Sequence, residues 1–65
     1  MLDRIVTDAM WEFRVWKAAD GMLWLRRGNE WFEFDEYYQC TDYQTTWEPE
    51  QRIAWARNIV RTVCS

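Results

Sequence analysis

Residues 22–34 read MLWLRRGNEWFEF, two short runs rich in aromatic side chains on either side of Gly28 and Asn29. A Gly-Asn pair between two such runs is typical of a two-residue β-hairpin turn. Residues that lie opposite each other in a hairpin share a face of the sheet, so this register gives one strand pair a consistently apolar face. The residues expected on that face are Leu23, Leu25, Phe32 and Phe34.

The other face of the same hairpin is aromatic and charged. There the register places Trp24 opposite Glu33 and Arg26 opposite Trp31, whereas the pair of Arg27 with Glu30 near the turn belongs to the first face. A guanidinium beside an indole permits a cation–π contact between Arg26 and Trp31.

Upstream, residues 10–17 read MWEFRVWK and alternate cleanly between two faces, which predicts another strand. Ala19, Asp20 and Gly21 fit a three-residue hairpin loop with glycine in the left-handed position. Both hairpins then agree on one apolar face, with the expected pairs Val15 with Leu25 and Trp16 with Trp24.

A long helix over residues 2–18 competes with this interpretation, because Leu2, Ile5, Phe13 and Trp16 also fit helical spacing and Gly21 could end it. The β-favouring residues of WEFRVW favour the strand. This leaves residues 2–7 as a short helix or an extra edge segment. Residues 35–47 show neither period and are expected to form a loop, with at most one helical turn.

The C-terminal part predicts an amphipathic helix over residues 49–63. Pro49 suits the first helical position, and acidic residues beside it complement the positive end of the helix dipole. Glu50, Arg57, Asn58 and Arg61 are expected on the solvent side. The expected core side consists of Ile53, Ala56, Ile59, Val60 and Val63.

These elements predict an α+β fold in a single small domain, residues 1–65. We expect a three-stranded antiparallel β-meander of residues 10–17, 22–27 and 30–36, with the C-terminal amphipathic helix packed on its apolar face.

The residue types present exclude most catalytic designs. The chain has no histidine and two cysteines far apart in sequence, so neither a zinc site nor a Cys-His nucleophile pair can be built. Glu33 and Asp35 would lie roughly 6.6–6.8 Å apart on one strand face, but a small sheet offers no deep cleft to raise the pKa of one carboxyl. We therefore expect no enzymatic activity, no cofactor and no metal.

The chain shows neither a signal peptide nor an apolar run long enough to span a membrane. Cys40 and Cys64 are too few for the disulfide framework of a small secreted domain. The sequence therefore predicts a soluble cytoplasmic protein with reduced thiols.

Charge is distributed unevenly along the chain. Residues 28–51 carry seven acidic side chains and no basic ones, within a net charge of −3. A field of one sign steers partners of the opposite sign, which favours a basic protein surface. Carboxylates interleaved with Tyr37, Tyr38 and Tyr43 could imitate a nucleic acid. Alternatively, Glu33 and Asp35 only keep an edge strand from pairing with another chain.

We therefore expect a protein-binding module, an inhibitor or adaptor that occludes a basic surface of a larger host protein such as a nucleic-acid-handling machine. By analogy of composition alone, such chains occur among virus- or phage-encoded inhibitors. Two alternatives stay open: an obligate homodimer, and a single-stranded nucleic-acid binder that stacks bases on tryptophan, which the acidic charge opposes. The candidate partner-binding residues are Trp16, Trp24, Arg26, Trp31, Glu33, Asp35, Glu36, Tyr37, Tyr38, Asp42 and Tyr43.

Overall fold

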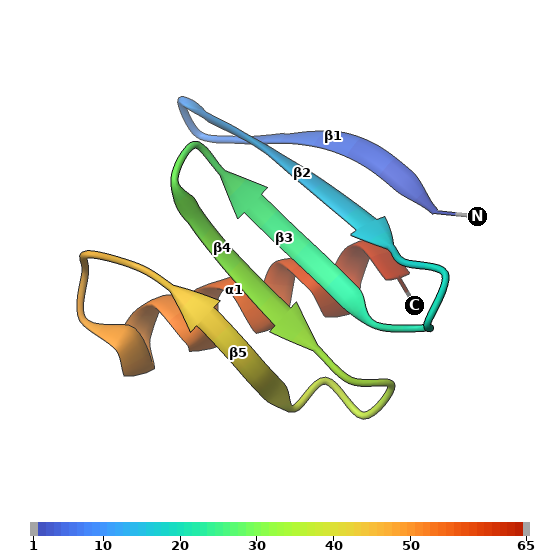
Figure 1. Ribbon diagram of the computed structural model, residues 1–65. Helices are drawn as coiled ribbons and strands as arrows, with labels where there is room; N and C mark the ends of the chain where they lie inside the picture. The colour runs from blue at the N-terminus through green and yellow to red at the C-terminus, as the bar shows by residue number, and fades with distance from the viewer. Residues whose placement is uncertain (1, 65) are drawn as a thin grey trace.

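The computed structural model describes residues 2–64 as a five-stranded antiparallel sheet with one helix across its back (Figure 1). The strands follow one another in the sheet in chain order, as in a meander. They are β1 (Asp3–Asp8), β2 (Trp11–Lys17), β3 (Leu23–Arg27), β4 (Glu30–Phe34) and β5 (Cys40–Gln44), and the helix is α1 (Pro49–Cys64).

The three predicted strands and the helix are confirmed in place and in register. β3 and β4 pair from Leu23 with Phe34 to Arg27 with Glu30, as the Gly28-Asn29 turn predicts. β2 and β3 pair Trp16 with Trp24, as predicted from the second hairpin. The expected number of strands is wrong, because the sheet has two more, one at each edge.

β1 forms where a short helix or an edge segment was expected, so the edge alternative holds and the long helix over residues 2–18 is wrong. The turn into β2 uses Ala9 at φ 56°, a left-handed conformation that non-glycine residues adopt uncommonly. The strand also lacks a strong apolar alternation: its apolar residue Ile5 lies on the outer face and is 62% exposed. Neither usual sign of a hairpin was therefore present.

β5 lies within the segment that was expected to be a loop. Its side chains are mostly exposed, and a register shift opposite Glu33 and Phe34 interrupts its pairing with β4. The preceding turn places Tyr38 at φ 63° and is held by Asp35, whose carboxylate accepts hydrogen bonds from the backbone N–H groups of Tyr37 (2.8 Å) and Gln39 (3.0 Å). An aspartate thus performs locally what a glycine-rich turn would signal in sequence.

The core lies between α1 and the sheet. Ala56 and Val60 are the fully buried helix residues, and their small side chains bring the helix close to β3 and β4. Trp55 packs edge-on against Phe13 and Phe32, at centroid distances of 5.6 and 6.5 Å. The buried apolar residues of the strands are Phe13, Val15, Leu23, Leu25, Phe32 and Phe34.

Arg57 corrects the expected solvent side of the helix. Its side chain is half-buried, and its Nε donates a hydrogen bond to the Tyr38 carbonyl oxygen at 2.9 Å. The bond ties α1 to the turn between β4 and β5. Within residues 2–64, no helix has the length and apolar character needed to cross a membrane.

Candidate functional site

Within residues 2–64, no element covers the sheet face opposite α1, and we call it the open face (Figure 1). Strand pairing arranges its side chains in two cross-strand rows. From β1 to β5, one row consists of Asp3, Trp16, Trp24, Glu33 and Asp42, and the other of Ile5, Arg14, Arg26, Trp31 and Gln44.

Three tryptophans occupy the middle of the open face and are half-buried by one another. The rings of Trp16 and Trp24 are stacked, with centroids 5.8 Å apart and planes 6° apart. Trp31 meets Trp24 at 5.5 Å and 47°. Beside these rings lies a shallow hollow of about 480 Å³, bordered also by Asn29 and Gln44, which we call the tryptophan hollow. Contacts between the rings thus fix a hydrophobic surface before any ligand arrives.

A paired arginine closes the β1 end of this surface. Arg14 donates two hydrogen bonds to Asp3, at 2.9 and 2.8 Å, and its guanidinium lies 4.8 Å from the Trp16 ring centroid. The hydrogen bond lowers the pKa of Asp3 and raises that of Arg14. Among the described residues, the cation–π contact of the open face therefore joins Arg14 to Trp16 instead of Arg26 to Trp31; Arg26 donates from Nε to the Gly28 carbonyl oxygen.

Two acidic residues, Glu33 and Asp42, are cross-strand partners at the β5 end, where the Asp42 carboxylate accepts a hydrogen bond from the Tyr43 backbone N–H at 2.9 Å. Glu33 is the cross-strand partner of both Trp24 and Asp42. Thr41 donates from Oγ1 to the Glu33 carboxylate at 2.8 Å, and none of the ion pairs within residues 2–64 involves Glu33 or Asp42. Like charges directly opposite on a sheet repel, so a cation bound at this end of the open face would reduce the repulsion between them.

The structure brings six of the predicted partner-binding residues together and places the other five elsewhere. Asp35, Glu36 and Tyr37 belong to the turn after β4, where Asp35 is engaged by backbone amides and so does not form a carboxylate pair with Glu33. Tyr38 packs against the helix side, and Tyr43 pairs with Phe32 on that same side. The six on the open face are Trp16, Trp24, Arg26, Trp31, Glu33 and Asp42.

Sequence reasoning missed the open-face residues contributed by the edge strands. Asp3 holds Arg14, Thr41 holds Glu33, and Gln44 donates from Nε2 to the Asn29 carbonyl oxygen at 2.7 Å. The sequences of β1 and β5 show no apolar alternation that predicts a strand. The positions of Asp3, Thr41 and Gln44 next to the open face could therefore not be predicted.

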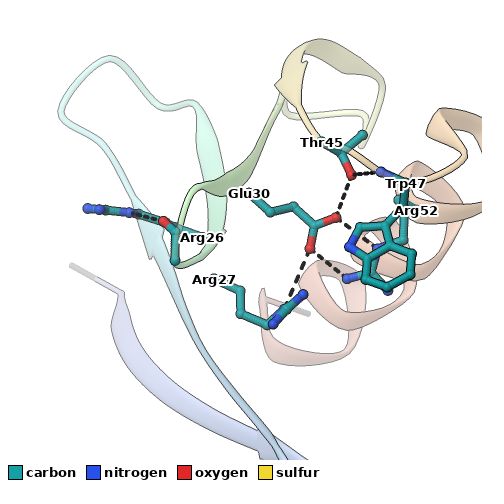
Figure 2. A network of polar contacts seen from close by, with 7 residues as sticks. Arg26, Arg27, Glu30, Thr45, Trp47 and Arg52 are labelled. Atoms are coloured by element: carbon teal, nitrogen blue, oxygen red, sulfur yellow. Dashed lines mark hydrogen bonds and ion pairs between the residues drawn. The ribbon is translucent and has the colours of Figure 1, made fainter.

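The helix side carries a separate cluster of charges around Glu30 (Figure 2). Glu30 is only 6% exposed and accepts two hydrogen bonds from Arg52, at 2.8 and 2.6 Å, and one from Thr45 at 2.7 Å. Arg27 lies 3.6 Å from the same carboxylate. One member of the acidic segment is therefore neutralised inside the molecule and does not contribute to an exposed acidic field.

Each of the two guanidinium groups of this cluster lies over an aromatic ring. Arg52 lies 3.7 Å from the Trp55 ring centroid, and Arg27 lies 3.6 Å from that of Trp11. Burial acts to raise the pKa of Glu30, but the hydrogen bonds from Arg52 and Thr45 and the two positive charges outweigh it and lower the pKa. The cluster joins the β3–β4 turn to the start of α1.

The two cysteines are free thiols in partly buried positions, and burial raises the pKa of both Cys40 and Cys64. A raised pKa keeps the thiol protonated and poorly nucleophilic at neutral pH. Within residues 2–64, no group of His, Cys, Asp and Glu is arranged to hold a metal ion.

Comparison with known proteins adds no relative: no family model, curated protein or solved structure matches the chain.

The Glu30 cluster predicts a specific pH dependence of stability. Because the pKa of Glu30 is lowered by folding, its contribution is present above the ordinary value of 4.5 and is lost as pH falls through the folded pKa. We expect Glu30→Gln to reduce the free energy of unfolding at pH 7 by about 1–3 kcal/mol. Urea denaturation at several pH values should show wild type and variant converging in acid. Parallel curves would contradict the assignment.

The Glu33–Asp42 pair predicts a stabilising double substitution. Glu33→Gln with Asp42→Asn keeps the shapes and hydrogen-bond acceptors but removes the repulsion, so the free energy of unfolding should rise by about 0.2–1 kcal/mol. Thermal and urea denaturation measure this, with Glu36→Gln in the exposed turn as a control for the loss of one exposed negative charge. A loss of stability in the double variant would show that the two carboxylates do not repel.

Proposed function

We propose that this protein is a small binding module whose open face docks on a basic surface of a larger protein, so that it acts as an inhibitor or adaptor. The observation that carries the proposal is one cross-strand row on an uncovered sheet face, in which the stacked Trp24 ring adjoins the facing carboxylates Glu33 and Asp42.

The tryptophans supply the apolar anchor of such an interface. Large rings that are already fixed lose little freedom on binding, and tryptophan and arginine are enriched among residues that dominate binding energy. Trp24 is held from both sides, by Trp16 and by Trp31, and the adjoining hollow offers room for a side chain of the partner.

The carboxylates supply the preference for a basic partner. A Lys or Arg side chain placed between Glu33 and Asp42 would relieve their repulsion and could also lie over the neighbouring Trp24 ring. The net charge of −3 adds a long-range attraction for a positively charged surface.

The positions of the remaining acidic residues favour a binding surface limited to the open face over a surface that imitates a nucleic acid. Glu30 is buried in ion pairs and Asp35 holds a turn. The exposed Glu48 and Glu50 lie at the start of α1, away from the open face, where they complement the helix dipole. The carboxylates available for docking on the open face are thus concentrated at its β5 end.

The test is affinity capture from a lysate of the cells in which the protein occurs, followed by a measured dissociation constant for each purified partner. We expect Glu33→Gln with Asp42→Asn to weaken binding at least about tenfold, since a lost charged hydrogen bond costs about 1.5–3 kcal/mol. Trp24→Ala should weaken it as well.

The matched control is Glu48→Gln with Glu50→Gln, which makes the same change in net charge outside the open face. Retained binding in this control and loss in the open-face variant support the proposal. Equal losses in the two variants would reduce the interaction to unspecific charge attraction, and unchanged binding in the folded open-face variant would refute it.

A further inference from the structure

The two N-terminal hairpins separate at one end of the sheet, the end that carries both of their turns (Figure 1). β1 pairs with β2 as far as Trp11, and β3 pairs with β4 as far as Arg27 and Glu30. The pairing of β2 with β3, however, stops at Arg14 with Arg26. A cleft of about 250 Å³ lies at this gap, which we call the arginine cleft; it is lined by Ile5, Glu12, Phe13, Arg14, Arg26, Arg27 and Gly28.

The arginine cleft has more positive than negative charge. Of its three guanidinium groups, that of Arg14 is neutralised by Asp3. Arg26 has only the Gly28 carbonyl oxygen as a side-chain hydrogen-bond partner within residues 2–64. Arg27 lies over the Trp11 ring, and its buried Nε is 3.6 Å from the Glu30 carboxylate, so this donor is not open to a ligand in the cleft. Glu12 is the one carboxylate in the lining.

Guanidinium groups with free N–H donors match the oxygens of a phosphate group, to which they can donate two bonds at once. Arg26 and Arg27 are successive residues on opposite faces of β3, so they approach the gap from its two sides. An anion in the cleft would accept hydrogen bonds from the terminal N–H groups of Arg26, which have no hydrogen-bond partner within residues 2–64.

The arginine cleft adjoins the tryptophan hollow, because Arg26 and Gly28 line both. The tryptophan hollow offers the solvent-facing parts of the Trp24 and Trp31 rings for apolar contact with a base, and the carboxamides of Asn29 and Gln44 at its border for hydrogen bonding. Stacking on aromatic rings with hydrogen bonds to the polar edge is how proteins hold unpaired nucleobases.

We propose that these adjoining hollows bind a nucleoside monophosphate, with the base in the tryptophan hollow and the phosphate in the arginine cleft. A single nucleotide fits better than a strand, because Glu12, Glu33 and Asp42 flank the site and repel further phosphates. The proposal goes beyond protein binding and does not depend on it, since the carboxylates of the β5 end take no part.

The test is a titration of the purified protein with the four nucleoside monophosphates, followed by NMR signals of the backbone amides and of the indole N–H groups. The four corresponding nucleosides, inorganic phosphate and phenyl phosphate are titrated in parallel. We expect at least one nucleotide to bind more tightly than its nucleoside and than inorganic phosphate, and to shift the indole signals of Trp24 and Trp31 together with the amide of Gly28.

Substitutions separate the two halves of the site. Arg26→Gln should weaken nucleotide binding about tenfold or more, which corresponds to one charged hydrogen-bond pair, and should weaken binding of the nucleoside much less. Arg26→Lys, which keeps the charge but loses the planar fork, should fall between the two. Arg4→Gln is the control, because it removes an exposed arginine outside both hollows.

Three results would overturn the proposal: no shift with any nucleotide, equal affinity of Arg26→Gln and wild type, or phenyl phosphate binding as tightly as the nucleotides, which would mean that the polar edge of the base is not read. A decathymidylate strand that binds far more tightly per nucleotide would replace the nucleotide by single-stranded nucleic acid. Glu33→Gln with Asp42→Asn should retain nucleotide binding, so a failure here is distinguishable from a failure of the protein-binding surface.

Discussion

One helix can cover only one face of a sheet, and the rest of this structure follows from that limit. α1 packs its small residues Ala56 and Val60 against β3 and β4, and the apolar side chains of three strands are buried beneath it. Burial of each large apolar side chain stabilises by about 1.5–3 kcal/mol, so the helix side holds the fold together. Within residues 2–64 no element covers the opposite face, where the three tryptophans pack against one another and Arg14 lies over Trp16.

The charged residues are divided by the same asymmetry. On the helix side, Glu30 binds Arg52 and Thr45 and fixes the start of α1 relative to the β3–β4 turn. On the open face, Glu33 and Asp42 are cross-strand partners, and neither forms an ion pair within residues 2–64. A protein gains no stability from such a pair, whereas a binding surface gains selectivity from it. The acidic segment of the sequence therefore has two separate physical roles.

The central part of the fold was predictable because each of its hairpins shows two independent signals in the sequence, one for the turn and one for the strand register. Gly28-Asn29 and Gly21 signal the turns, and alternation of apolar residues along β2, β3 and β4 sets the register, which in turn brings Trp16, Trp24 and Trp31 together. The edge strands carry neither mark. Their turns use Ala9 and Tyr38 at positive φ, and their side chains stay largely exposed, so local sequence preference says little about them. Asp3, Thr41 and Gln44 were missed for the same reason.

A partner can bind the open face only if that face is free in solution. The most direct test is the molecular mass of the protein, measured by sedimentation equilibrium over a wide range of protein concentration. The predicted result is a single species at the monomer mass of 8.1 kDa, in which the tryptophans are available to a partner. A stable species of twice that mass, returned to the monomer mass by Trp24→Ala, would mean that a second copy of the chain already covers the open face, and would contradict the central claim.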